Sequence, residues 1–196
     1  MKNIIDKKSL LKALTNIPNA QDRFIVMALF YGIIGTDCRD LLDLKVSDID
    51  LENNIIKIED KIIPIEKEFK EIIVAAINQK IYLANSNNSF GNMDFVMNEQ
   101  SEYIIKVRPT VVNRFGLDAL SLNALKDRIR TLSKLMGIKI NTRNLVTSGA
   151  IYRVLKENKR NDEGRIIVKD VENTLLKYGY VLSTYRIYKI VNGIEK

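Results

Sequence analysis

The sequence of 196 residues contains no histidine and no tryptophan, and it has a single cysteine, Cys38. Zinc centres are built mainly from His and Cys ligands, so a zinc site is excluded. Ser-His-Asp and Cys-His nucleophile systems are excluded for the same reason. One cysteine cannot form an internal disulfide, which fits a protein of a reducing compartment, and we expect a cytoplasmic location.

Carboxylates are the remaining metal ligands, so an all-carboxylate Mg²⁺ site is the one kind of metal centre left open. The densest group of acidic residues is Asp37, Asp40, Asp43, Asp48 and Asp50. Their positions are mostly typical of helix ends and turns. We therefore expect no metal and no cofactor.

Long apolar runs are also missing. The most apolar stretch, from Phe24 to Ile34, is too short to span a bilayer, which needs about 20 apolar residues. Residues 1–17 alternate charged and apolar side chains and lack a signal-peptide cleavage site. We expect no membrane partner. The apolar run is instead typical of a helix buried on all sides at the centre of a globular core.

The remaining pattern predicts one domain over residues 1–196, mainly α with a small antiparallel β-sheet, an α+β fold. Asp6, Asn19, Ser121 and either Thr142 or Asn144 are predicted helix caps. The expected helices lie near residues 7–17, 20–34, 38–44, 67–82, 121–136, 145–158, 166–177 and 185–191. Strands are expected at 55–58, at 62–65 and within 94–97, and a polar loop at 84–102.

The charge is distributed unevenly. The formal net charge is +7, yet residues 1–97 hold 12 basic and 14 acidic side chains, whereas residues 98–196 hold 19 and 10. An excess of positive charge in one half favours a polyanionic partner such as nucleic acid. A solvated basic face is the alternative interpretation.

The most specific motif follows the apolar run. It is Gly35-Thr36-Asp37-Cys38-Arg39-Asp40-Leu41-Leu42-Asp43-Leu44, and it precedes a hairpin at residues 55–65. This order resembles the first half of the catalytic domain of tyrosine recombinases, the phage integrase family. The resemblance implies that family's fold. It also implies a hairpin lysine, for which Lys57 and Lys61 are the candidates, with Lys57 slightly favoured.

The resemblance carries a contradiction, because the family's catalytic side chains are replaced. Its first arginine corresponds to Asp37. In the stretch from Asn141 to Ala150, which resembles the His-x-x-Arg-His motif, Arg143 occupies the first His slot, Val146 the arginine slot and Thr147 the residue after it. Guanidinium groups are needed to neutralise the charge on the reacting phosphate. The sequence therefore predicts that strand cleavage is lost and that Tyr188, near the nucleophile position, is vestigial.

We therefore expect a non-catalytic protein that binds double-stranded DNA, of the kind represented by integrase-like repressors of prophages or mobile elements. The family's separate N-terminal core-binding domain is expected to be absent, or the chain to be a fragment of a longer protein. A homo-oligomer through the C-terminal helix is a further expected partner. The DNA-binding candidates are Arg39, Lys57, Lys61, Arg143, Arg153, Lys156, Lys159, Arg160 and Arg186, with Arg128, Arg130 and Lys134 as a second face.

Two other interpretations stay open. One is an active but divergent recombinase or nuclease that uses Arg39, Lys57, Arg143 and Tyr188. The other is a protein-interaction module that pairs with a true integrase through its final helix.

Overall fold

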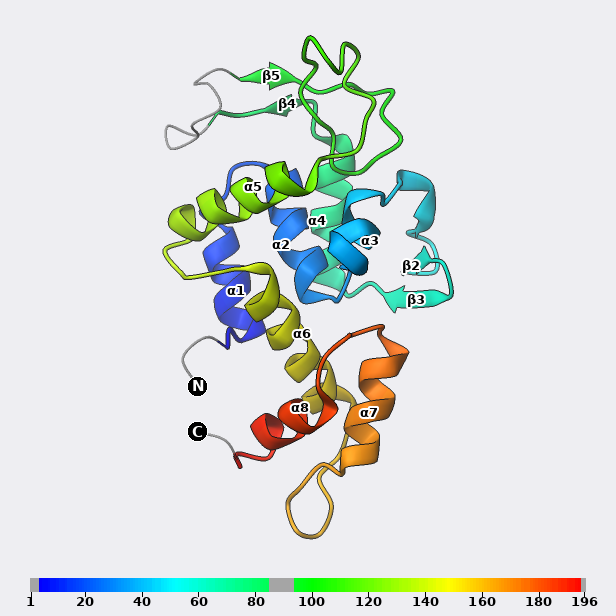
Figure 1. Ribbon diagram of the computed structural model, residues 1–196, viewed down its shortest axis with the longest axis vertical. Helices are drawn as coiled ribbons and strands as arrows, with labels where there is room; N and C mark the ends of the chain where they lie inside the picture. Colours follow the sequence, from blue (N-terminus) through cyan, green and yellow to red (C-terminus); the bar gives the residue numbers. More distant parts are fainter. Residues whose placement is uncertain (1–3, 85–93, 195–196) are drawn as a thin grey trace.

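The computed structural model describes residues 4–84 and 94–194, and within them the chain is a helical domain with two small antiparallel sheets (Figure 1). The helices are α1 (Lys7–Leu14), α2 (Ala20–Phe30), α3 (Arg39–Leu42), α4 (Lys67–Asn78), α5 (Leu122–Leu135), α6 (Thr142–Glu157), α7 (Val168–Lys177) and α8 (Thr184–Val191), with 3₁₀ turns η1 (Thr36–Cys38) and η2 (Val46–Asp48). The strands are β1 (Ile49–Asp50), β2 (Ile55–Ile58), β3 (Lys61–Pro64), β4 (Ile81–Tyr82) and β5 (Phe95–Val96). The predicted α+β fold is confirmed.

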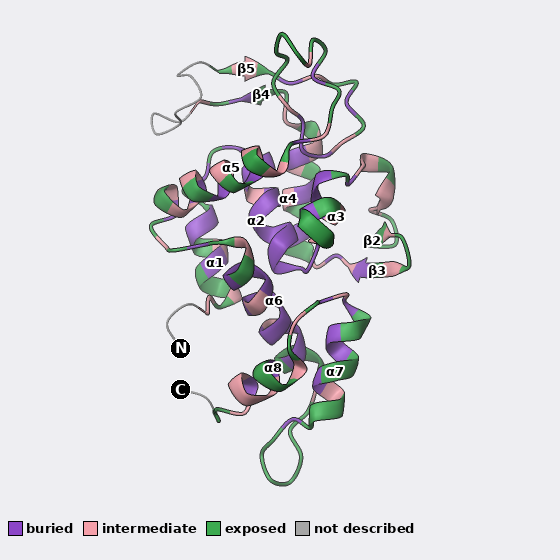
Figure 2. Cartoon of the chain, in the orientation of Figure 1, coloured by how far each residue is buried: buried purple, intermediate pink, exposed green. Residues whose placement is uncertain are grey.

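The centre of the fold is α2, as the apolar run predicts. Every residue from Phe24 to Phe30 is at most 1% exposed, and Figure 2 shows the helix surrounded by the other elements. It packs against both α4 and α6. Burying one large aliphatic or aromatic side chain contributes about 1.5–3 kcal/mol relative to exposure, so α2 is the largest apolar contributor to the core.

The C-terminal end of α2 lies at Phe30 and not at the predicted Ile34. Gly32 takes a left-handed conformation with φ of 85°. Its N–H and that of Ile33 bond to carbonyls of the last helical turn at 3.2 and 2.9 Å. These two bonds form a Schellman motif, which glycine adopts without the steric cost of a Cβ. The prediction was wrong because apolar character alone does not mark where a helix ends.

The helix α4 also ends before its predicted limit, at Asn78 rather than Tyr82. Gln79 is extended, and its side chain accepts from the Gln21 N–H at 2.9 Å and donates to the Ile81 carbonyl at 2.9 Å. Ile81 and Tyr82 then form β4, which pairs with β5. The strand predicted within residues 94–97 is confirmed. Residues 85–93 of the predicted polar loop lie outside the described residues.

The predicted C-terminal helices all form, and α6, α7 and α8 pack together at one end of the long axis (Figure 1). The cap of α6 is Asn141 and not Thr142 or Asn144. The side chain of Asn141 accepts from the Asn144 N–H at 2.8 Å, and that of Asn144 accepts from the Asn141 N–H at 2.7 Å. This reciprocal capping box satisfies two backbone donors. Among the described residues, no helix has the length and hydropathy to cross a membrane.

One carboxylate joins α1, α4 and α6. Glu66, the N-cap residue of α4, accepts from Lys7 at 2.6 Å and from the Tyr152 hydroxyl at 2.8 Å through Oε2. Its Oε1 accepts from Arg153 at 3.1 Å and from Lys156 at 2.8 Å. Burial alone would raise the pKa of Glu66, but the hydrogen bonds from Lys156, Lys7 and Tyr152 outweigh it and lower the pKa to about 2. The carboxylate is therefore ionised under ordinary conditions.

The most buried of these cations is Arg153. Its guanidinium also donates to the Pro64 carbonyl at 3.2 Å. The rings of Tyr31 and Tyr178 lie 4.8 and 4.6 Å from it, at cation–π distance. A guanidinium so enclosed depends on Glu66 for its counter-charge, because an unpaired buried charge is strongly destabilising.

We predict that Glu66→Gln lowers the free energy of unfolding by about 3 kcal/mol at neutral pH, because it leaves Arg153 buried beside a neutral group. Glu68→Gln is the matched control. Glu68 is half exposed and, in the described residues, pairs only with Lys7, so its loss costs about 0.5 kcal/mol or less. Urea denaturation of the three proteins measures the difference, and equal losses in the two variants would contradict this role.

The difference in stability between wild type and Glu66→Gln should also depend on pH. The pKa of Glu66 is about 2 in the folded protein against an ordinary value of 4.5. The stability that its charge contributes is therefore present above about pH 4.5 and disappears as the pH falls toward 2. The difference in stability between wild type and Glu66→Gln should shrink over that window. A difference that stays constant from pH 6 to pH 3 would contradict the assignment.

Candidate functional site

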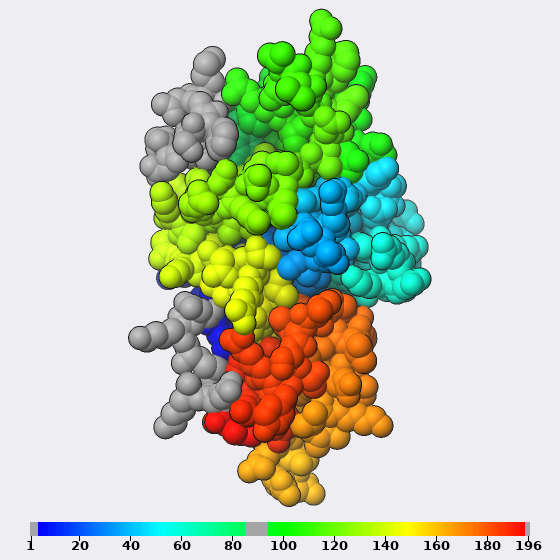
Figure 3. Space-filling model, viewed as in Figure 1, coloured from blue at the N-terminus to red at the C-terminus, as the bar shows by residue number. Residues whose placement is uncertain are grey.

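Four segments meet where the sequence motifs fall: the turn after α2, the β2–β3 hairpin, the first half of α6 and the turn between α7 and α8. Gly149 of α6 faces the Phe30 carbonyl so closely that a Cβ would lie 1.5 Å from its oxygen. The Tyr180 hydroxyl donates to the same oxygen at 2.9 Å. At Gly179 a Cβ would lie 2.7 Å from the Lys61 side chain. We call this meeting point the junction; Figure 3 shows the turn after α2, α6 and α8 side by side on one face.

Asp37 lies in η1, at the edge of the junction. It and Cys38 both take left-handed backbone conformations, with φ of 51° and 62°. Aspartate tolerates this conformation better than most residues. The side chain of Asp37 is exposed. The slot that corresponds to the family's first arginine therefore presents a carboxylate to solvent.

The two hairpin lysines lie on opposite faces. The register pairs Ile56 with Ile63 and Ile58 with Lys61 on the face toward the core, whereas Lys57 lies on the other face. The Nζ of Lys61 binds the Asp40 carboxylate at 2.8 Å. The Nζ of Lys57 lies 3.8 Å from Asp50, and its side chain is 60% exposed. The geometry thus places Lys61 at the junction, rather than the slightly favoured Lys57.

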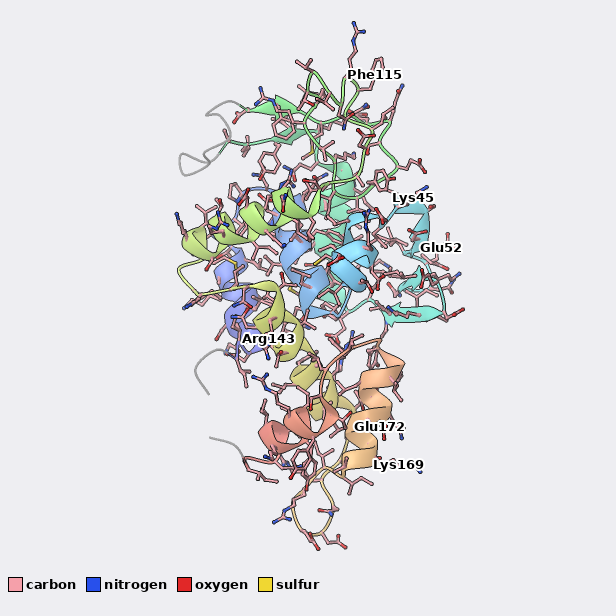
Figure 4. All side chains as sticks on the ribbon, in the orientation of Figure 1. Lys45, Glu52, Phe115, Arg143, Lys169 and Glu172 are labelled. Atoms are coloured by element: carbon pink, nitrogen blue, oxygen red, sulfur yellow. The ribbon has the colours of Figure 1, made fainter. Side chains whose placement is uncertain are left out.

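The first half of α6 carries the second motif. Val146 is 4% exposed and belongs to the apolar core, and Thr147 is half-buried. Neither could present a cation to a phosphate. Arg143, in the first turn of α6, is exposed (Figure 4). Of the three motif positions, it alone offers a positive charge to solvent.

Tyr188 is a half-buried residue of α8. Its ring stacks on that of Tyr185, with centroids 6.1 Å apart and planes inclined by 16°, and it packs against the core. These contacts account for an aromatic side chain at this position without any reaction chemistry.

Sequence reasoning missed Tyr180, although it follows Gly179 where the related motif has histidine. The residue is buried, and desolvation raises the pKa of its hydroxyl well above the ordinary value. A neutral hydroxyl that donates to the last carbonyl of α2 acts as a structural donor here. The signal that could have found it is the Tyr-Gly-Tyr stretch at residues 178–180.

Several of the predicted DNA-binding residues have partners within the protein. Arg153 and Lys156 bind Glu66, Lys61 binds Asp40, and Arg160 donates to the Gly164 and Val191 carbonyls at 2.8 and 2.9 Å. Arg39 lies 3.5 Å from Asp43 but remains 70% exposed. In the described part of the chain, three exposed candidates have no ion pair or side-chain hydrogen bond: Arg143, Lys159 and Arg186.

The second candidate face, on α5, is divided. Arg128 is largely buried, 3.8 Å from the Asp22 carboxylate and 4.9 Å from the Tyr82 ring. Arg130 is exposed and binds Asp127 at 3.0 Å. Lys134 is exposed. The outer side of this helix can therefore meet an anion, whereas Arg128 serves to hold α5 against α2.

A hollow of about 240 Å³ lies between α3 and the hairpin. Its lining consists of Arg39, Asp40, Asp43, Leu44, Asp48, Lys57, Ile58 and Glu59. Four carboxylates and two cations make this lining net negative, which opposes entry of a phosphate. No cluster of three or more His, Cys, Asp or Glu side chains in residues 4–84 and 94–194 could hold a metal ion.

Comparisons with known proteins agree with this architecture. The crystal structure of XerA recombinase matches with a TM-score of 0.59 at 17% sequence identity, covering 100% of this chain and 66% of that chain. The expected tyrosine-recombinase fold is thus confirmed, and the chain spans 66% of the length of that relative. No curated protein matches the chain. Residues 4–192 match the family described as MrpR, C-terminal catalytic domain. Because that match spans nearly the whole sequence, the chain belongs to this MrpR C-terminal catalytic domain family.

Proposed function

We propose that this chain is a non-catalytic protein that binds double-stranded DNA and acts as a transcriptional repressor of a prophage or other mobile element. The observation that carries the proposal is the pair of replacements in a recombinase fold. Asp37 presents a negative charge, and Val146 is buried, where the related enzymes place arginines.

The chemistry of phosphate cleavage supports the loss of activity. The transition state gathers negative charge on the phosphate oxygens, and removing one stabilising donor typically lowers the rate about 10²–10³-fold. Here one position is occupied by a carboxylate and the other by an alkyl group in the core. The hollow beside α3 is net negative as well. Neither of these two positions supplies a guanidinium that could hold a phosphate beside the Tyr188 hydroxyl.

The exposed cations support retained binding. Arg143, Lys159 and Arg186 are the proposed primary phosphate contacts, because they have no internal partner in the described residues. Arg39, Lys57 and Lys156 are exposed but each lies beside a carboxylate of this chain, so we propose them only as secondary contacts. Lys61, Arg153 and Arg160 act indirectly, by holding the junction and the turn after α6 in place.

A repressor role is consistent with a dimer of this chain. Dimeric DNA-binding proteins read paired half-sites, and two weak sets of phosphate contacts combine into one strong one. Tyr185 of α8 is 61% exposed, and we propose that two chains associate through this helix. Because the proposed target is genomic DNA, we also propose a cytoplasmic location.

We predict that duplex binding is strongly salt dependent and that Arg143→Ala weakens it. Each phosphate contact lowers log K by about 0.9 for each tenfold rise in salt, so the variant should lose roughly one unit of slope. Lys169→Ala, an exposed lysine of α7 (Figure 4), is the matched control and should leave the slope unchanged. Titration of genomic duplex fragments from about 50 to 200 mM salt measures both. A flat salt response, or no binding at the lowest salt, would refute the proposal.

We also predict that Asp37→Arg tightens duplex binding, because it replaces a repelling charge with an attracting one at the junction. The expected gain is roughly tenfold at low salt. Glu71→Arg, an equal charge change at an exposed position of α4, is the control, because the helix α4 lies behind α2 in Figure 1. If both variants gain affinity equally, the junction is not part of the DNA surface.

A further inference from the structure

The loop that follows residue 106 exposes apolar side chains at its tip. Val111 and Val112 are 101% and 97% exposed, and Phe115 is 66% exposed. Figure 4 shows Phe115 at the far end of the long axis from α7. Three large apolar side chains within five residues are not explained by packing, and contiguous exposed apolar surface usually marks an interaction site.

The tip is braced by its own hydrogen bonds. The Thr110 N–H donates to the Asn113 carbonyl at 2.9 Å, and the Asn113 N–H donates to the Thr110 hydroxyl at 3.0 Å. The Gly116 N–H also donates to the Asn113 carbonyl, at 3.1 Å. The Asn98 side chain donates to the Phe115 carbonyl. Val111 and Val112 are thus presented by a closed turn.

The base of the loop is anchored in the core. Gln21 of α2 is fully buried; its amide donates to the Ile104 carbonyl at 2.8 Å and accepts from the Lys106 N–H at 3.1 Å. The Lys106 ammonium donates to the Ile77 carbonyl of α4 at 3.2 Å. These bonds fix the base of the loop to α2 and α4. The apolar tip can therefore contact a partner while the loop keeps its position.

The charge beside the tip is positive. Arg108 and Arg114 flank the two valines in the sequence and are both exposed, and the Arg108 guanidinium lies 5.8 Å from the centroid of the Phe95 ring. No acidic residue occurs from residue 103 to residue 117. Two arginines around an apolar point are complementary to a duplex, which offers phosphates on either side of a groove and apolar base faces between them.

We infer that the loop of residues 107–117 is a second DNA contact, which inserts Val111 and Val112 between base steps of the minor groove while Arg108 and Arg114 bind the flanking phosphates. The inference rests on the proposed duplex binding and adds a contact that bends the DNA. Unstacking a base step costs a few kcal/mol and is offset by the protein surface that the bent duplex then contacts.

The test is a bending and affinity assay on a duplex of about 40 base pairs, long enough to bend under protein contacts, with fluorophores at both ends. Val111→Ser combined with Val112→Ser should weaken binding roughly tenfold and straighten the DNA, while the salt slope stays unchanged, because valines displace no counterions. Arg108→Ala combined with Arg114→Ala should instead reduce the salt slope by about 2. Leu176→Ser, at an exposed apolar position of α7 that is 73% exposed, is the control and should change neither quantity.

The outcomes separate the two claims. If wild type binds the duplex and the loop variants match it in affinity and bend, the loop inference is overturned and the proposed function stands. If wild type binds no duplex at all, the proposed function and the loop inference both fall. If the valine variants change only the association of protein with protein, measured by sedimentation without DNA, the loop is a protein-docking element and the inference is wrong. The mutated side chains are exposed, so thermal unfolding should confirm intact folds.

Discussion

The shared carboxylate of Glu66 is the interaction on which the arrangement of this domain depends. It receives donors from α1 and α6 while it stands at the start of α4. Because α6 is tied down at its C-terminal half, its N-terminal half is held across α2, where Gly149 permits contact with the Phe30 carbonyl. The position of Arg143 in the first turn of α6, and with it the proposed DNA surface, follows from that crossing.

The ion pairs of Glu66 also affect how the positive charge of the C-terminal half should be interpreted. The C-terminal half of the sequence is strongly basic, but Arg153 and Lys156 are bound to Glu66, and Arg160 is bound to backbone carbonyls. Part of the positive charge that indicates a polyanionic partner is thus structural. The cations that stay exposed without an ion pair in the described residues, Arg143, Lys159 and Arg186 among them, are spread over several elements.

Local signals in the sequence were enough for the framework. The predicted caps Asp6 and Ser121 accept from backbone N–H groups, Asn19 precedes α2 without a side-chain cap bond, and the apolar run predicted the buried helix. Signals that depend on tertiary contacts were not available. The partners of Glu66 lie 59 to 90 residues away along the chain. Which hairpin lysine faces the junction depends on strand register, and the alternation with Ile56 and Ile63 could have indicated Lys61.

The central claim is that this recombinase fold holds a duplex and does not cut it. A nicked suicide duplex, whose cleavage traps any covalent protein–DNA intermediate, tests both halves in one titration when each sample is read on a native gel and on a denaturing gel. The account predicts a shifted band on the native gel that weakens with salt and no adduct on the denaturing gel. A covalent adduct that disappears in Tyr188→Phe would contradict it.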